Sequence, residues 1–204
     1  MLNFTLAVVA AYLIGSISFA VVVSKFSGLA DPRTYGSKNP GATNVLRSGN
    51  KKAAVLTLLG DALKGTVAVV LAFHFQDALA LTKSDIAWVG LAAFVGHLYP
   101  IFFRFEGGKG VATALGVLLG LNWILGLATA VTWLVIAYFF RYSSLAALVA
   151  SVFAVFYNLL LFGANGQAAA IAIMAGLLVY RHKQNIANLI AGKESKIGAK
   201  KVAK

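Results

Sequence analysis

The sequence predicts an all-α integral membrane protein, a helical bundle of about seven transmembrane segments. Of its 204 residues, 60% are hydrophobic and only 12% are charged, whereas soluble globular domains carry about 25% charged residues. The mean hydropathy is +0.83. Several apolar stretches approach the length of about 20 residues that a helix needs to cross the ~30 Å hydrocarbon core. Cysteine is absent, which excludes disulfides, thiol nucleophiles and cysteine metal sites.

Seven apolar segments follow one another along the chain. They cover roughly residues 4–24, 53–73, 86–103, 111–122, 124–140, 144–162 and 168–180. The first lacks the positive n-region of a cleaved signal peptide, so we interpret it as a retained first helix. The segments 111–122 and 168–180 are short for a full crossing, and five spans plus a re-entrant pair is therefore the alternative. Both counts are odd, so either one places the termini on opposite sides of the membrane.

The basic residues predict the orientation. Sixteen of the 18 Lys and Arg residues lie in the 25–52 loop, around 104–109, at Arg141, or from Arg181 onward. Loops rich in Lys and Arg stay in the cytoplasm. The N-terminus is thus predicted outside and the basic tail, 181–204, inside, where it would also bind anionic lipid. The formal charge of +12 therefore reflects membrane topology, and no nucleic-acid partner is expected.

The loop GSKNPGATNVLR, residues 36–47, has the composition of an anion site. Its glycines let main-chain amides approach a ligand closely, and its proline fixes a bend. Polar and charged donors are supplied by Ser37, Lys38, Asn39, Thr43, Asn44 and Arg47. The planar guanidinium of Arg47 can grip two phosphate oxygens. A basic cytoplasmic loop that merely makes turns would explain the same residues, so this loop alone leaves both interpretations open.

A second stretch, FEGGKGVAT at 105–113, has the same character. Gly107, Gly108 and Gly110 surround Lys109 directly before an apolar segment. Amides at a helix N-terminus together with a lysine form an anion site. The Walker A spacing is missing, so a nucleotide site is unsupported. Two such loops on one membrane face suggest two phosphorylated ligands, or one ligand with two phosphates.

Asp61 and Lys64 place opposite charges inside an apolar segment. They lie one turn apart and are predicted to share a helix face. Each charge costs about 2.5–3.5 kcal/mol on the insertion scale when it is held at mid-membrane. Charges within a membrane usually face a cavity or a partner. A self-satisfied ion pair and a role in shaping the site both remain open, and we group the two residues as structural.

His182 and Asn185 are three residues apart and are predicted to lie on one helical face at the inner boundary. His97 stands near the end of the third segment, where a structural hydrogen bond explains it as well as chemistry does. The sequence has no Ser–His–Asp order, HExxH motif or Asp-rich set. Metal catalysis is therefore disfavoured, and we expect no metal and no cofactor.

These motifs together resemble one family. The chain is similar to the bacterial membrane-integral acyl-phosphate:glycerol-3-phosphate acyltransferases, the PlsY family. The stretches that carry the resemblance are AYLIGSISFA, DPRTYGSKNPGATNVLRSGNKKAA, GDALKG, GHLYPIFFRFEGGKGVATALG, YSSL and RHKQNIANLIAGKE. The two glycine-containing loops at this separation are far more specific than either loop alone. The segments near 74–85 and 121–140 carry no signature.

The resemblance implies a reaction and a set of site residues. An acyl group would pass from acyl phosphate to the 1-hydroxyl of glycerol 3-phosphate, giving 1-acyl-glycerol 3-phosphate and phosphate at a bacterial inner membrane. The catalytic residues would be Ser37, Arg47, His182 and Asn185. The substrate- and phosphate-binding residues would be Lys38, Asn39, Thr43, Gly107, Gly108, Lys109, Gly110 and Ser144. Glu194 would serve structural integrity. The chain would be a single transmembrane acyltransferase domain over residues 1–204.

The reaction needs no catalytic triad, because acyl phosphate is already activated. We favour direct attack by the glycerol hydroxyl, with Ser37 as a hydrogen-bonding group; an acyl-enzyme on Ser37 is the alternative. His182 or a phosphate oxygen of the substrate would take the proton. A soluble enzyme that makes acyl phosphate is a candidate partner.

Two other functions fit parts of the sequence. A transporter or exchanger of phosphorylated solutes would also use helix N-termini and intramembrane charge, but it would need ligand groups near the midplane and on both faces. A lipid-binding scaffold would use the basic tail KESKIGAKKVAK, yet it leaves the glycine loops unexplained.

Overall fold

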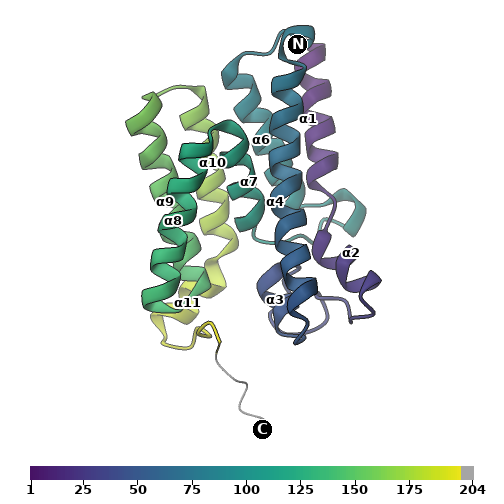
Figure 1. Cartoon of the computed structure of the whole chain (residues 1–204), viewed down its shortest axis with the longest axis vertical. Coiled ribbons are helices and arrows are strands. Elements are labelled where there is room, and N and C mark those ends of the chain that lie inside the picture. Colours follow the sequence, from purple (N-terminus) through teal and green to yellow (C-terminus); the bar gives the residue numbers. More distant parts are fainter. Residues whose placement is uncertain (199–204) are drawn as a thin grey trace.

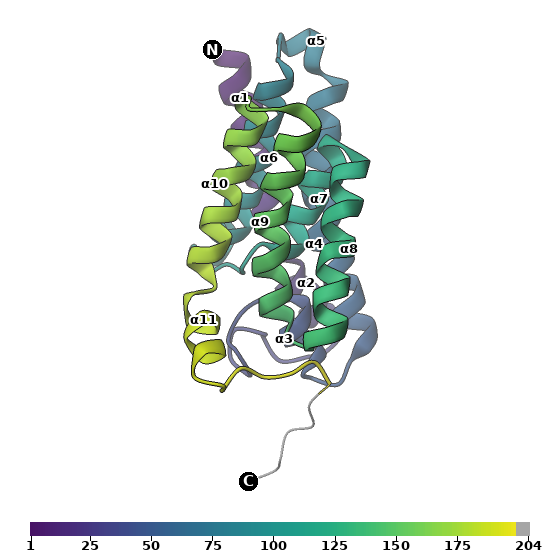
Figure 2. The ribbon, with the colours of Figure 1, turned by 90° about the vertical axis from the view of Figure 1, so that its left-hand side faces the viewer.

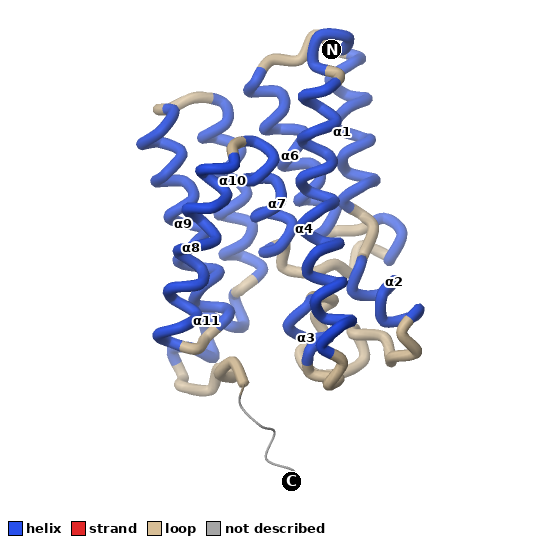
Figure 3. The backbone as a smooth tube through the Cα atoms, viewed as in Figure 1, coloured by secondary structure: helices blue, strands red, loops and turns tan. Residues whose placement is uncertain are grey.

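The computed structural model describes residues 1–198, which form helices and loops without a strand (Figure 3). The helices are α1 (Leu2–Gly15), α2 (Phe19–Phe26), α3 (Ala42–Leu46), α4 (Lys51–His74), α5 (Gln76–Leu79), α6 (Lys83–Leu98), α7 (Val111–Leu121), α8 (Trp123–Phe140), α9 (Ser143–Phe162), α10 (Gly166–Arg181) and α11 (Lys183–Ile190), with a 3-10 turn at Ile101–Phe103. The all-α prediction is confirmed for this range. Residues 199–204 of the predicted basic tail lie outside the described residues.

The long helices form two neighbouring groups (Figure 1). In one group α1 packs on α4 and α6, and α4 packs on α7; in the other, α9 packs on both α8 and α10. Contacts between α7 and α8 and between α6 and α10 join the groups. The core at this junction includes the fully buried side chains of Phe94, Leu98, Leu125 and Ile171.

The outer surface of the bundle is apolar, as a lipid-facing surface must be. Leu134 and Leu160, for example, keep 60% and 71% of their surface exposed. Among residues 1–198, five helical stretches are long and apolar enough to cross a membrane: Leu2–Phe26, Lys51–His74, Lys83–Phe103, Trp123–Phe140 and Ser143–Phe162. The helices Val111–Leu121 and Gly166–Arg181 are apolar but shorter, in agreement with the two segments that the sequence predicted to be short.

The first predicted segment, residues 4–24, corresponds to the candidate span Leu2–Phe26, but it contains a helix break. The chain leaves the helix after Gly15 and re-enters it at Phe19, so α1 and α2 are separate helices. The hydroxyl of Ser16 donates to the carbonyl oxygen of Tyr12 at 2.8 Å, a back-bond that commonly bends helices. The break frees the carbonyl of Ile17, which accepts a hydrogen bond from Lys64 Nζ at 2.6 Å. Hydropathy alone cannot detect this interruption, since the residues around it are apolar.

The functional loops gather at one end of the bundle (Figures 1 and 2). One end of the bundle holds the N-terminus and the connections α4–α5–α6 and α9–α10. The other end holds α2, α3, α11 and the segment that follows α11 up to Gly198. Helix α7 has 11 residues, which is about 16 Å of helix and only part of a ~30 Å hydrocarbon core. Its first residue follows the glycine loop, defined here as residues 105–110, which reaches in between the two groups of helices.

Candidate active site

The glycine loop is shaped by close main-chain packing. The N–H of Gly108 donates to the carbonyl oxygen of His97 at 3.1 Å, and a Cβ atom at Gly108 would collide with the His97 ring. Gly110 has a φ of +84°, and a Cβ there would collide with the ring of Phe94. Glycine is required at both positions because a larger residue would displace the loop.

Arg181, at the end of α10, fixes the other side of this loop. Its Nη2 donates to the carbonyl oxygen of Gly107 at 2.7 Å, and its Nε donates to that of Gly108 at 3.1 Å. The guanidinium also lies over the ring of Tyr99, 5.5 Å from the centroid. These bonds occupy two carbonyl oxygens of the loop with a cationic donor.

The loop 36–47 is organised by Asn44. Its buried side chain accepts the N–H of Ser37 at 3.0 Å and donates to the carbonyl oxygens of Pro32 at 2.7 Å and Tyr35 at 3.1 Å. Asn44 therefore holds the loop from within. The expectation that its side chain supplies a donor to a ligand is wrong, because these bonds occupy its amide.

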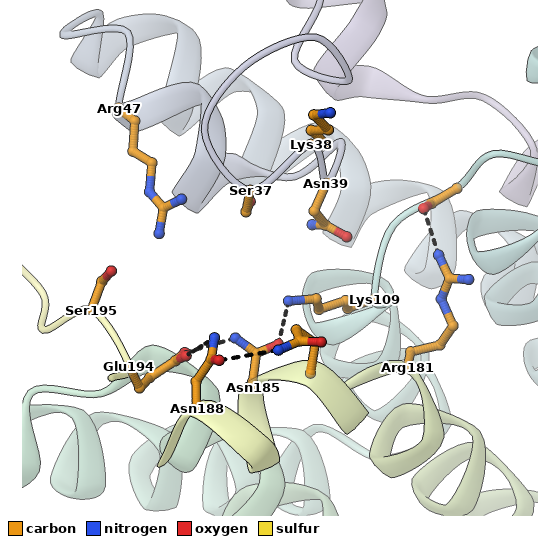
Figure 4. A pocket seen from close by; sticks show the side chains of 12 residues that line it. Ser37, Lys38, Asn39, Arg47, Lys109, Arg181, Asn185, Asn188, Glu194 and Ser195 are labelled. Atoms are coloured by element: carbon orange, nitrogen blue, oxygen red, sulfur yellow. Dashed lines mark hydrogen bonds between the residues drawn. The ribbon is translucent and has the colours of Figure 1, made fainter. Parts of the chain in front are cut away.

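The two loops face each other across a cavity of about 430 Å³. Figure 4 shows Ser37 and Arg47 on one wall and Lys109 with α11 on the other. The predicted site residues that line the cavity are Ser37, Lys38, Asn39, Arg47, Gly107, Lys109, Asn185 and Glu194. The structure thus brings together residues that lie up to 157 positions apart in the sequence (194 minus 37).

A chain of hydrogen bonds holds Lys109 in place. Lys109 Nζ donates to Asn185 Oδ1, and Asn185 Nδ2 donates to Glu194 Oε1 at 2.7 Å (Figure 4). The same carboxylate accepts the hydroxyl of Ser144 and, at 3.4 Å, the amide of Asn188. Ser144 is buried and supports Glu194; it does not line the cavity.

The charges in the cavity favour an anion. Four cationic side chains line it, those of Lys38, Arg47, Lys109 and Arg181, with the single carboxylate of Glu194. Burial lowers the pKa of Lys109; Arg47 and Arg181 lower it further, while Glu194 opposes them. A bound phosphate would favour the charged form of this lysine, since an opposite charge nearby raises an ammonium pKa.

His182 lies behind the cavity. It is the junction between α10 and α11, where the regular helix is interrupted, and Asn185 follows in α11. Of these two residues, Asn185 lines the cavity and His182 does not. His182 is 3% exposed, and its Nδ1 lies 2.8 Å from the carbonyl oxygen of Leu178, to which it donates. Burial lowers the pKa of His182 to about 4, with a smaller contribution from Lys109 and opposition from the Leu178 carbonyl.

Besides Ser144 and His182, five predicted residues stand apart from the cavity lining. Thr43 is exposed on α3, and Gly108 and Gly110 are buried within the glycine loop. Asp61 and Lys64 are buried and joined by an ion pair of 2.9 Å. Within residues 1–198, no group of three or more His, Asp or Glu side chains is arranged to hold a metal ion.

The sequence interpretation missed several lining residues, which are Arg181, Gln184, Asn188 and Ser195. On α11, Asn188 lies three residues after Asn185 and four after Gln184, so helical spacing from Asn185 would have found Asn188, and spacing from Asn188 would have found Gln184. Arg181 carries no such signal, because its role depends on two carbonyl groups far away in sequence.

Comparisons with known proteins agree with this geometry. A family model described as glycerol-3-phosphate acyltransferase matches residues 5–192. Glycerol-3-phosphate acyltransferases from Herminiimonas arsenicoxydans and Janthinobacterium sp. (strain Marseille) are each 66% identical to this chain over 200 residues, covering 98% of it and 98% and 100% of their own length.

A solved structure has the same fold. The crystal structure of PlsY, an integral membrane glycerol 3-phosphate acyltransferase, in its glycerol 3-phosphate form superposes with a TM-score of 0.88 at 37% identity, over 96% of both chains. A lysophosphatidic acid form of PlsY gives a TM-score of 0.87 at 36% identity, over 96% of this chain and 95% of that one. The chain belongs to the glycerol-3-phosphate acyltransferase family and is a membrane-integral acyltransferase.

Proposed function

We propose that this acyltransferase takes its acyl group from acyl phosphate and transfers it to the 1-hydroxyl of glycerol 3-phosphate. One observation carries the proposal: a single cavity has cationic groups on two facing walls, with Arg47 on one and Lys109 on the other. Both substrates of this reaction carry a phosphate group, and each wall can bind one of them. A transporter would need ligand groups near the midplane and on both faces, whereas the groups here gather at one end of the bundle.

The two walls are assigned to different substrates. Ser37, Lys38, Asn39 and Arg47 would bind the phosphate of the acyl donor. The second wall would bind glycerol 3-phosphate, with Lys109 and the amides at the start of α7 facing its phosphate. Asn185 and Glu194 would keep Lys109 directed into the cavity through their hydrogen bonds. Thr43 is given no role, since it is exposed outside the cavity.

The transfer would be direct. The oxygen of the glycerol 1-hydroxyl attacks the acyl carbonyl carbon, an ester bond forms, and the bond from that carbon to the phosphate oxygen breaks. Inorganic phosphate leaves with the electron pair. Within the described residues, no histidine or carboxylate hydrogen bonds to the hydroxyl of Ser37, so a base that would make it a nucleophile is missing there. Ser37 would instead donate to the developing oxyanion, a contribution of about 3–4 kcal/mol for a good donor.

The proton of the attacking hydroxyl would go to a phosphate oxygen of the substrate. His182 is the other candidate, and its imidazole is neutral near pH 7 because its pKa is about 4. Its side chain, however, does not line the cavity, and its position behind Lys109 suits support of the site better than contact with the hydroxyl.

The end of the bundle that holds the cavity would face the cytoplasm of a bacterial cell, and the N-terminus would lie on the outer side of the inner membrane. The chain would cross the membrane seven times and form a single domain over residues 1–204. The support is the charge placement, because basic loops stay inside and the basic 25–52 and 104–109 stretches lie at the cavity end. A soluble enzyme that makes acyl phosphate could then deliver the donor from the cytoplasm.

The donor is tested with the purified full chain and glycerol 3-phosphate. Acyl phosphate and acyl-CoA of the same chain length are supplied in separate reactions, and product and released phosphate are measured. We expect 1-acyl-glycerol 3-phosphate and phosphate in equal amounts from acyl phosphate, and no product from acyl-CoA. Turnover with acyl-CoA alone would reject the proposed donor.

A further inference from the structure

A network of ionisable side chains is buried behind the glycine loop and outside the cavity lining. Asp61 Oδ1 lies 2.9 Å from Lys64 Nζ and 3.5 Å from His97 Nδ1. The side chains of Asp61, Lys64 and His97 are 3%, 2% and 7% exposed. Such charges are costly inside a membrane, and an apolar pair of similar size would avoid the cost. We therefore expect these side chains to act through the directed bonds that they make, which fix the positions of the elements around them.

His97 connects this network to the glycine loop. The carbonyl oxygen of His97 accepts the N–H of Gly108 at 3.1 Å. The side-chain Nε2 of His97 occupies the space that a Cβ atom at Gly108 would need, and the carbonyl oxygen of Pro40 lies 2.9 Å from the same point. The imidazole thus packs directly on Gly108, the residue before Lys109, while its other nitrogen faces Asp61. The position of the His97 imidazole therefore determines how deeply the glycine loop lies within the bundle.

Lys64 connects the network to the break between α1 and α2. Its Nζ donates to the freed carbonyl oxygen of Ile17 at 2.6 Å and faces Asp61 on its own helix. The network therefore joins the break, helix α4 and the end of α6. Movement of any one of these would reach the glycine loop through His97. On the opposite side of the loop, Arg181 holds the carbonyl oxygens of Gly107 and Gly108.

We propose that Asp61, Lys64 and His97 are positioning residues for the binding of glycerol 3-phosphate. They hold Gly108, and so fix Lys109 and the amides at the start of α7 where the phosphate binds. The inference rests on the proposed function, which assigns the glycine loop to this substrate. The three residues should affect the binding of this substrate and not that of the acyl donor. Within residues 1–198, the hydrogen bonds and ion pairs of the network do not end on the Ser37–Arg47 wall.

The test removes the charges without leaving one unpaired. Asp61→Asn alone would leave the buried Lys64 ammonium unpaired and would strongly destabilise the fold. The main variant is therefore Asp61→Leu/Lys64→Met, in which both charges are replaced by apolar side chains. A second variant, His97→Asn, keeps the ion pair and removes the ring that packs on Gly108. Each is purified, and its Tm is measured with and without glycerol 3-phosphate. KM for each substrate and kcat are then measured.

We expect both variants to keep a Tm close to that of the wild type without ligand. The KM for glycerol 3-phosphate should rise about 10- to 100-fold, the scale of a misplaced binding group, and the KM for acyl phosphate should stay unchanged. The rise in Tm caused by glycerol 3-phosphate should shrink, since this rise depends on ligand affinity. Lys109→Ala gives the reference for full loss of this phosphate contact.

Asn158→Leu is the matched control. Asn158 is a fully buried polar residue on α9 that accepts a hydrogen bond from Gln167 at 2.6 Å at the start of α10, the far end of the bundle. Its substitution should leave both KM values unchanged. Two folded variants with a wild-type KM for glycerol 3-phosphate would overturn the inference, as would equal increases in both KM values.

The Tm readout separates this inference from the donor proposal. It uses glycerol 3-phosphate without any acyl donor, so it remains informative if acyl phosphate is not the donor. If Lys109→Ala also leaves the ligand-induced rise in Tm intact, the assignment of the loop itself is wrong. If only the network variants leave it intact, the inference alone is wrong.

Discussion

Lys109 and Ser37 lie on opposite walls of one cavity and are assigned to different tasks. Lys109→Ala should strongly raise the KM for glycerol 3-phosphate, because it removes a charge that binds the ground state and the transition state alike. Ser37→Ala should chiefly lower kcat, by about 10²–10³ if its hydroxyl donates to the oxyanion. Steady-state kinetics on both purified variants measures this division. Lys193 is exposed and lies outside the cavity lining, so Lys193→Ala serves as the control. Identical kinetic changes in Lys109→Ala and Ser37→Ala would contradict the assignment.

His182 predicts a pH dependence of stability. Its folded-state pKa of about 4 lies below the ordinary value of 6.5, so between these values the unfolded chain binds a proton that the native state excludes. The free energy of unfolding should therefore fall as the pH is lowered from 6.5 to 4, by up to about 3 kcal/mol from this residue. Denaturant unfolding in detergent at several pH values measures the fall. His182→Gln should flatten this part of the profile, and an unchanged slope would show that the neutral imidazole contributes nothing.

At the scale of elements, close helix crossings depend on glycines. A Cβ atom at Gly116 on α7 would collide with the main chain of Ala62 on α4, and Gly65 on α4 meets Thr113 and Val117 on α7 in the same way. Small residues let membrane helices approach to main-chain contact. The crossing places the start of α7, and hence the glycine loop, against α4.

Gly116→Ala should therefore destabilise the bundle by about 1–3 kcal/mol, the usual loss for overpacking. Thermal unfolding of the purified protein measures it. Gly176 is the matched control, since it lies within α10 with open space around its missing Cβ. Gly176→Ala should be neutral or stabilising, because alanine favours the helix. Equal losses in both variants would show that the crossing is not tightly packed.

The sequence predicted most helices and only part of the site, for a physical reason. Apolar stretches determine where helices run, and the spacing of Asp61 and Lys64 correctly predicted that they share a helix face; the ion pair was one of two interpretations that the sequence left open. The break at residues 16–18 was missed because the segment around it is apolar and because Lys64, which binds the freed carbonyl of Ile17, is distant in sequence. The same applies to Arg181, whose partners are the carbonyl groups of Gly107 and Gly108. The pattern also gave no sign that α10 ends and α11 begins at His182.

For the molecule as a whole, the account depends on which end faces the cytoplasm. The chain has no cysteine, so single cysteines can be introduced at the exposed positions Ser48, near the cavity end, and Asn165, in the α9–α10 connection. An impermeant thiol reagent should label Asn165→Cys in intact cells, because that turn is expected outside. It should label Ser48→Cys only after permeabilisation. Labelling of Ser48→Cys in intact cells would reverse the orientation.

The central claim is that one cavity holds both phosphate groups, each on its own wall. The most direct measurement is a structure of the full chain with glycerol 3-phosphate and a non-transferable acyl phosphonate bound together. The account predicts the phosphate of glycerol 3-phosphate at Lys109, the phosphonate at Ser37 and Arg47, and the 1-hydroxyl about 3–3.5 Å from the acyl carbon. Either ligand outside the cavity, or both anions on one wall, would contradict it.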